Sequence, residues 1–454
     1  MSKIRFFGAI MLLALIIQSG YFNLEKSLYA DSAFYLYQII NDQILPVQHN
    51  RIAGALAAIP AYVANEMGFH PSKVFKLFAM GPWLILLLIF SLMIYLKRIV
   101  EPMVLVITLV WFTRESFFIT TEVPLAMGFA LLFQTALSAS IFEISDRRKK
   151  IGVIISGMSA GAAILAHPYG VFFVGFFMLW AFLFKQQELK YLLKFVAIIA
   201  IGLAVKMIFF PSSGYEQSFL NVPLLSLQEL RNSYSSFFFF NAYGGMYLLL
   251  VIIWVLSLFR LNTSEARIPF LITLLGVPLL WYYTLLVYAE GDANPMMEKS
   301  FMIIALPVVF IYIDRNVQLW KGISGFQFIA IWIVSVMSLG RLIKSGETYS
   351  TRLYHLDKEV TRLTHEGRGK FYIYDNQLKN EIWQVKWALP FESLLMSMKT
   401  EGVGKTTLIA IQPGEDEKLQ PHRFHGPDFF YAPRVDSMNI KRFALDNMEW
   451  RKVE

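Results

Sequence analysis

The sequence predicts a polytopic α-helical membrane protein with about eleven transmembrane helices, interfacial helices in the first outer loop and a small C-terminal soluble α+β domain. The 454-residue chain is 56% hydrophobic and only 16% charged. Its apolar residues come in long blocks, which is typical of an integral membrane protein. From about Ser345 the composition becomes polar. We therefore expect a membrane domain over residues 1–342 and an extracytoplasmic α+β domain over residues 343–454.

The basic residues that flank the apolar blocks predict the orientation. A first apolar run follows Lys3 and Arg5 without a convincing cleavage site, so we expect an uncleaved helix with its N-terminus inside. Short basic loops such as 147–150 then obey the positive-inside rule only if residues 52–68 do not cross the membrane. Residues 32–44 and 52–68 are therefore expected to form two interfacial helices. The candidate spans are residues 4–22, 75–96, 103–119, 122–143, 151–167, 169–184, 195–212, 244–259, 268–288, 301–315 and 323–341.

The polar tail carries its own secondary-structure signals. Residues 351–365 have the period of an amphipathic helix, and residues 371–374 and 407–411 have the composition of strands. The run 401–407 ends like a phosphate-binding loop, but the first glycine of that pattern falls at Lys399 and a strand-like run follows, so we reject a nucleotide site there. The apolar face of the predicted helix comprises Leu353, Leu356, Val360 and Leu363.

The composition restricts the chemistry. The chain has no cysteine, which excludes disulfides, thiolate metal sites and cysteine nucleophiles. The seven histidines are scattered without metal-ligand spacing. No cofactor or metal is therefore indicated, although a divalent metal stays open. The net charge of +8 arises mainly in short loops between apolar blocks and does not indicate nucleic acid.

Ionisable residues gather on the expected outer face. A charge at the lip of a span is costly when unpaired, so such residues tend to face a cavity or a partner. Asp31 lies among tyrosine and phenylalanine residues shortly after the first span, and it is the candidate catalytic base. The candidate substrate-binding residues are Arg51, Arg114, Glu115, Glu122, Lys206, Glu298 and Lys299.

Several of these residues also have plainer interpretations. Asp31 is well placed to cap the helix that follows it, and Glu122 resembles another acid at a helix start. Lys206 is able to extend to the lipid headgroups, and His167 fits a turn. Lys299 opposes the dipole of the following helix, so a bound anion there would relieve a cost.

Together these features resemble the GT-C membrane glycosyltransferases, particularly the protein-mannosyltransferase-like and aminoarabinose-transferase-like branch. The first outer loop opens with an acid beside aromatic residues, here Asp31-Ser-Ala-Phe-Tyr, and two interfacial helices follow. Two short spans meet at a proline turn, here Gly157-Met-Ser-Ala-Gly161 through His167-Pro168. A late loop leads into a span through Lys299-Ser-Phe301 and Leu306-Pro307, where Arg-Tyr is commoner than Lys-Ser-Phe. The likeness covers about residues 1–340.

The resemblance implies a multi-pass glycosyltransferase of the plasma (inner) membrane with a polyprenyl-phosphate-linked sugar donor. Asp31 would deprotonate the acceptor hydroxyl as it attacks and inverts the anomeric carbon. Lys299, with Arg51 or Arg114, would stabilise the departing lipid phosphate. The partners would be the donor, a glycan, lipid or protein acceptor and membrane lipids, without nucleic acid. Two alternatives remain, namely a transporter or flippase of lipid-linked or small solutes, and a non-catalytic assembly protein. A transporter typically has ionisable residues near the bilayer midplane and two related halves, and neither is visible in the sequence.

Overall fold

The computed structural model describes most of the helical and C-terminal parts of the chain. The described residues are 2–47, 51–118, 122–142, 146–184, 189–209, 228–229, 234–258, 298, 301–319, 325–367, 369–379, 383, 385–421, 423–424, 435, 438–445 and 449–453.

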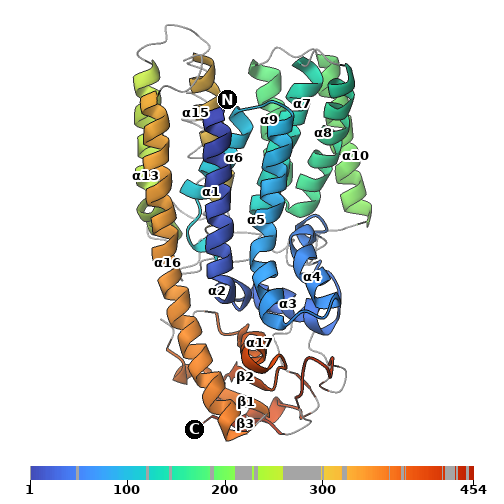
Figure 1. Ribbon diagram of the computed structural model, residues 1–454, viewed down its shortest axis with the longest axis vertical. Coiled ribbons are helices and arrows are strands. Elements are labelled where there is room, and N and C mark those ends of the chain that lie inside the picture. Colours follow the sequence, from blue (N-terminus) through green and yellow to red (C-terminus); the bar gives the residue numbers. More distant parts are fainter. Residues whose placement is uncertain are drawn as a thin grey trace.

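The long helices run along the long axis of the molecule (Figure 1). They are α1 (Ser2–Tyr21), α5 (Pro71–Tyr95), α6 (Val100–Trp111), α7 (Val123–Phe142), α8 (Asp146–Ala166), α9 (Tyr169–Phe184), α10 (Leu189–Phe209), α13 (Tyr234–Leu258), α15 (Met302–Leu319) and α16 (Gly325–Glu366). Each overlaps an expected span, while the expected span 268–288 lies outside the described residues. Within the described ranges, five helices are long and apolar enough to cross a membrane, namely α1, α5, α7, α8 and α16. The prediction of a helical, membrane-like protein is confirmed to that extent.

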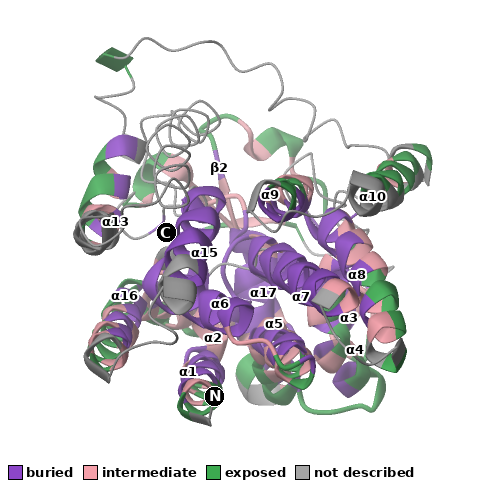
Figure 2. Ribbon diagram, turned by 90° about the horizontal axis from the view of Figure 1, so that it is seen from above, coloured by how far each residue is buried: buried purple, intermediate pink, exposed green. Residues whose placement is uncertain are grey.

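The outer faces of these helices are apolar. Figure 2 shows the buried residues concentrated on α6, α7 and α15 in the middle of the bundle, whereas α8 and α10 carry exposed residues on their outer sides. The exposed residues include large hydrophobic side chains. Lipid tails solvate such a surface, whereas water does not. Examples are Leu13, Ile17, Leu88, Ile154, Met158, Leu179, Ile201 and Ile333.

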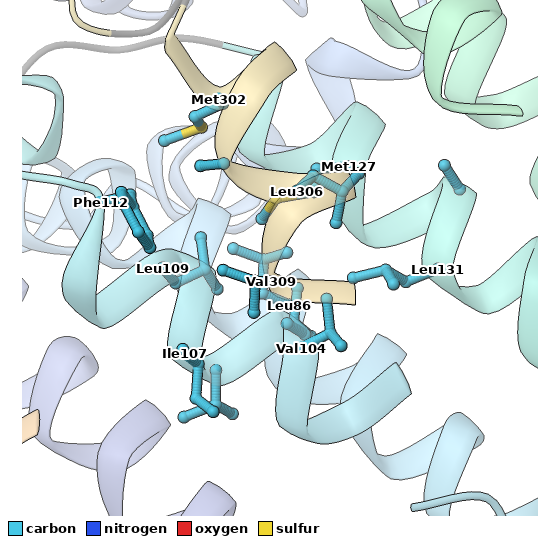
Figure 3. Close-up of a cluster of buried hydrophobic side chains, with 14 of the residues drawn as sticks. Leu86, Val104, Ile107, Leu109, Phe112, Met127, Leu131, Met302, Leu306 and Val309 are labelled. Carbon is cyan, nitrogen blue, oxygen red and sulfur yellow. The ribbon is translucent and has the colours of Figure 1, made fainter. Parts of the chain in front are cut away.

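The core of the bundle lies where α5, α6, α7 and α15 meet. Every residue of α6 is buried, which follows from its apolar sequence on all sides. Figure 3 shows how side chains from the four helices interdigitate there. The labelled residues are Leu86, Val104, Ile107, Leu109, Phe112, Met127, Leu131, Met302, Leu306 and Val309.

Between α1 and α5 the chain forms four short helices. They are α2 (Asn23–Ser27), α3 (Asp31–Asn41), η2 (Gly54–Ala58) and α4 (Ile59–Glu66). With eight residues, α4 is too short to cross a bilayer. Residues 52–68 therefore do not form a span, as predicted. The helix α3 differs from expectation, because all its residues from Ser32 to Ile40 are buried and protein rather than lipid covers them.

The C-terminal region contains a small parallel sheet. Its strands β1 (Gly369–Tyr374), β2 (Thr406–Ile411) and β3 (Arg451–Lys452) have the order β2-β1-β3. The helix α17 (Leu389–Glu401) connects β1 to β2, so these three elements form a βαβ unit. Gly402 ends α17 with a φ of 73°. The run that resembles a phosphate-binding loop is therefore a helix C-terminus followed by a strand, in agreement with its rejection.

One long helix and one hydrophobic cluster join this region to the segment between α1 and α5. The helix α16 continues from the bundle to Glu366 without interruption, across the expected domain boundary at residue 343. Its predicted apolar face is buried at Leu356, Val360 and Leu363. The same cluster contains Phe34 and Tyr37 of α3 beside residues of α17 and β2. The C-terminal region therefore packs directly on α3, as Figure 1 also shows at the lower end of the bundle.

Candidate functional site

Asp31 occupies the first position of α3, directly after a tight turn. The N–H of Ser32 donates to the carbonyl of Tyr29 across 3.1 Å, and Ala30 between them has φ 49° and ψ −128°. These angles match the first central residue of a type II′ turn. Ala30 is thus the N-cap, without a side-chain cap hydrogen bond, so the interpretation of Asp31 as the capping residue is wrong. Asp31 lies in the first helical turn, where the helix dipole favours an acid.

A pocket lies between α3, η2 and the N-terminal parts of α5 and α7. It is small, with a volume of about 30 Å³, and its walls are mainly apolar. Glu122, just before α7, contributes a carboxylate to the lining. The lining also includes Tyr35, Pro46, Ala55, Phe78, Pro82 and Leu125.

Close backbone packing shapes this pocket. A Cβ atom on Gly54 would lie 2.4 Å from Cγ of Glu122, so only glycine leaves room for the glutamate side chain. A Cβ atom on Gly81 would lie 1.9 Å from the carbonyl oxygen of Ala57. The backbone of η2 therefore rests directly on α5. Pro82, inside α5, has no N–H and cannot donate a hydrogen bond to the carbonyl of Phe78 four residues earlier. Pro82 and Phe78 both line the pocket.

Arg51 and Glu122 form an ion pair beside the pocket. Nη1 of Arg51 lies 3.1 Å from Oε2 of Glu122, and about a tenth of each side chain is exposed, 10% and 12%. The structure thus brings together two predicted substrate-binding residues that are far apart in the sequence. Because their charges offset one another, Arg51 does not present an uncompensated cation to the pocket.

The catalytic candidate Asp31 lies on the same helix as Tyr35, which lines the pocket. Asp31 and Tyr35 are four residues apart, which places them on the same face of α3, one turn from each other. The ring of Tyr35 lines the pocket. Asp31 itself is not among the lining residues, so it lies one helical turn before the part of α3 that borders the pocket.

The predicted turn between two short helices is present. The helix α8 ends at Ala166 and α9 begins at Tyr169. Nδ1 of His167 accepts a hydrogen bond of 3.2 Å from the N–H of Tyr169, which supports the turn interpretation of this histidine. A Cβ atom on Gly170 would lie 1.9 Å from the carbonyl oxygen of Ala163, so the two helices meet closely at this point.

The end of α8 also contacts Lys206 and the first outer loop. Nζ of Lys206 lies 3.5 Å from the carbonyl oxygen of Ile164, and the N–H of Ala53 donates to the next carbonyl, that of Leu165, across 3.3 Å. The carbonyls at a helix C-terminus carry the negative end of the dipole. Lys206 therefore lies against a helix end instead of extending toward headgroups. The end of α8 that contacts Lys206 therefore also binds Ala53, which follows Arg51 and Ile52 in the loop.

A second polar cluster lies between α6, α15 and α16. Nε of Arg114 donates to Oγ of Ser345 across 2.9 Å. The carboxylate of Glu298, which is fully buried, accepts a hydrogen bond from the N–H of Ser116 in η3 (Glu115–Phe117). Two further predicted residues, Arg114 and Glu298, thus belong to this cluster.

Arg341 of α16 completes the cluster and was not predicted as a site residue. Its guanidinium donates to the carbonyls of Trp111 across 2.6 Å and of Ala242 across 2.9 Å. It also interacts electrostatically with Glu298 and Arg114. A basic residue at the end of an apolar run is a signal of a polar cluster inside the protein. From the sequence, Arg341 is placed only at the end of the expected span 323–341.

The remaining predicted residues are only partly described. The backbone of Glu115 lies in η3, and its side chain is not among the described parts of the chain. Lys299 lies outside the described residues, directly after Glu298.

Lys26 is another buried cation that the sequence did not single out. Its Nζ donates to the carbonyl of Phe117, and it lies 4.0 Å from the centre of the Phe117 ring and 5.4 Å from that of Trp83. Burial lowers the pKa of Lys26 to about 7. No local pattern identifies such a residue, because its partners come from two other helical segments.

A buried ion pair from the C-terminal region supports the turn before Asp31. The carboxylate of Glu392 contacts Arg352 and accepts a hydrogen bond of 2.9 Å from the N–H of Ala30. Burial raises the pKa of Glu392, while Arg352 and the Ala30 N–H act in the opposite direction. No local sequence pattern indicates this contact.

Across the parts of the chain described above, no three His, Asp or Glu side chains lie close enough together to hold a metal ion. The chain matches no family model, no curated protein and no solved structure. The site is therefore interpreted from its own geometry.

Proposed function

We propose that this protein is a membrane glycosyltransferase that moves a sugar from a polyprenyl-phosphate donor to an acceptor hydroxyl, with Asp31 as the base. The observation that carries the proposal is that Asp31 begins α3 one helical turn before Tyr35, which lines the pocket together with Glu122. Acids that perform proton transfer need such a position beside a binding space.

In the proposed reaction the acceptor oxygen attacks the anomeric carbon, and its proton passes to Asp31. The new C–O bond forms as the bond from the sugar to the phosphate oxygen breaks, so the anomeric centre is inverted and no enzyme nucleophile is needed. The products are the glycosylated acceptor and the polyprenyl phosphate.

The leaving phosphate needs fixed positive charge nearby. Arg51 is a weak candidate, because Glu122 already offsets its charge. Among the side chains that the structure describes in the second polar cluster, two are arginines, Arg114 and Arg341, and one is a carboxylate, that of Glu298. Lys299 follows Glu298 in the sequence. We assign the phosphate to this cluster and propose Lys299 as its further cation.

The proposed setting is the plasma (inner) membrane, with about eleven spans and the N-terminus inside. The C-terminal region would lie on the extracytoplasmic side as a soluble domain. Two observations support this arrangement. The C-terminal region packs against α3 of the first outer loop, and the N-terminus of α1 lies at the opposite end of the bundle from it (Figure 1).

The test is the variant Asp31→Asn in the full-length protein in liposomes. The substrates are a panel of polyprenyl-phosphate hexoses, with acceptors supplied by membranes from cells that lack the protein. The measurement is release of polyprenyl phosphate. Loss of a general base typically lowers the rate by about 10²–10⁴-fold.

Asp42→Asn is the matched control, because Asp42 lies at the other end of the same helix and should leave turnover near the wild-type rate. Wild-type turnover in Asp31→Asn would remove Asp31 as the base. An absence of release with every donor in the wild-type protein would favour the transporter or assembly alternatives.

A further inference from the structure

The turn before Asp31 has a backbone conformation that its sequence does not favour. Ala30 has a φ of 49°, in a region where alanine is rare and glycine is readily accommodated. The first central position of a type II′ turn is normally glycine for this reason. Such a conformation persists only when surrounding contacts hold it in place.

The contact that holds Ala30 comes from the C-terminal region. Oε1 of Glu392 accepts the Ala30 N–H across 2.9 Å, although 362 positions separate the two residues. The Glu392 side chain is completely buried, so water does not compete for this hydrogen bond. A charged acceptor makes it stronger than a hydrogen bond between neutral groups.

Arg352 of α16 fixes the Glu392 carboxylate. Its Nη2 contacts the second carboxylate oxygen, and its guanidinium lies 5.0 Å from the ring centre of Tyr29 and 5.6 Å from that of Trp383. Tyr29 is the residue before Ala30. The ion pair therefore contacts two successive residues of the turn, namely Ala30 through its backbone N–H and Tyr29 through its ring.

Aromatic contacts fix the rest of α3 on the same support. Phe34 packs on Phe391 with ring centres 5.1 Å apart, and Tyr37 lies against Phe391, Phe424 and Phe443. Phe391 is the residue next to Glu392 on α17. The helix that begins with Asp31 and the carboxylate that holds its turn are thus parts of one packed unit.

We infer that Glu392 is a positioning residue for Asp31, so that the C-terminal region supplies part of the active site. The inference rests on the proposed function for the role of Asp31. Glu392 holds Ala30 in its turn conformation, and this turn fixes the start of α3, where Asp31 is the first residue.

The test compares the full-length wild type with Glu392→Leu and with the double variant Ala30→Gly/Glu392→Leu, all in nanodiscs. Two quantities are measured, namely hydrogen exchange of the amides of residues 29–32 and the turnover of polyprenyl-phosphate hexoses. In Glu392→Leu we expect exchange at these amides to rise by about tenfold or more. We also expect kcat to fall by about tenfold or more with little change in KM, since misplacement of a reacting group affects the chemical step.

Glycine at position 30 adopts a positive φ without help. The double variant should therefore recover much of the lost protection and turnover. A role of Glu392 in the stability of the C-terminal region alone would not be rescued by a substitution in this turn. Asp357→Asn is the matched control, because it removes an exposed ion pair with Lys399 between the same two helices, α16 and α17, and should change neither quantity.

If Glu392→Leu does not fold, Glu392→Gln keeps an oxygen that accepts from Ala30 but loses the charge, and it should show a smaller increase at the same amides. Unchanged exchange at residues 29–32, or no recovery with Ala30→Gly, would overturn the inference. If the wild type is inactive but the hydrogen-exchange pattern is as expected, the result counts against the proposed function alone. The conclusion that Glu392 holds the turn at Ala30 would then remain valid.

Discussion

Nη1 of Arg51 lies 3.1 Å from Oε2 of Glu122, and this ion pair connects the loop between α1 and α5 to the start of α7. Both side chains are largely buried. At such a position the loss of one partner leaves the other charge poorly solvated, whereas the loss of both does not.

Glu122→Gln should lower the free energy of unfolding by about 1–3 kcal/mol, because it leaves Arg51 without its carboxylate in a poorly hydrated site. The double variant Arg51→Met/Glu122→Gln should recover part of that loss. Denaturant or thermal unfolding of the four proteins of this cycle in detergent measures the coupling. Additive effects would show that the pair does not stabilise the loop.

Lys26→Met should raise stability most at neutral pH. An unfolded lysine titrates near 10.5 and Lys26 in the folded protein near 7, so the unfolded state binds more protons between these pH values. The free energy of unfolding therefore rises with pH between about 7 and 10.5, and this gain in stability is lost again as pH falls to 7. Melting temperatures from pH 7 to 10 should show this slope in the wild type and a smaller slope in Lys26→Met. Lys76→Met, at an exposed position of α5, is the control, and equal slopes in all three proteins would refute the argument.

Gly81→Ala should destabilise the protein and deform the pocket. The added methyl would meet the carbonyl of Ala57 at 1.9 Å, and overpacking of this kind typically costs about 1–3 kcal/mol. Gly157→Ala on α8 is the matched control, since its methyl would meet no described atom within 4 Å and alanine favours a helix. The comparison of the two melting temperatures is the measurement, and a stable Gly81→Ala protein would contradict the close contact of η2 with α5.

Single cysteines test the orientation, because the native chain has none. Lys418→Cys in the C-terminal region should react with an impermeant maleimide added to intact cells, whereas Lys97→Cys after α5 should react only after the membrane is opened. Both positions are exposed. The reverse pattern would place the pocket and the proposed site in the cytoplasm.

Local patterns predicted the elements of this fold well. Apolar blocks located the helices, and strand-like composition located β1 and β2, because each signal depends on residues close together in the sequence. The glycines at which two segments approach each other closely were harder to predict from the sequence. Gly157 and Gly161 carried the family resemblance, yet no described atom would touch a side chain added at either, whereas Gly54 and Gly81 are the positions of close approach.

The site was predicted less completely, for a physical reason. Glu122, Arg114 and Glu298 were predicted as charges at or near the ends of spans and Arg51 as a charge in the first loop, but their pairing depends on the tertiary fold. The contact of Glu392 with Ala30 joins residues with no shared pattern. Long-range contacts of this kind leave no local signal in one sequence.

The 42 residues of α16 form a single rod about 63 Å long at a rise of about 1.5 Å per residue. Its upper part belongs to the bundle, where Arg341 is bound, and its lower part carries Arg352 and the apolar face beneath the sheet. Arg352 lies eleven residues beyond Arg341, or about 16 Å at this rise, so a tilt of a few degrees about Arg341 would displace Arg352 by about 1 Å. One continuous helix thus connects the polar cluster of the bundle to the contacts that hold the turn at Ala30.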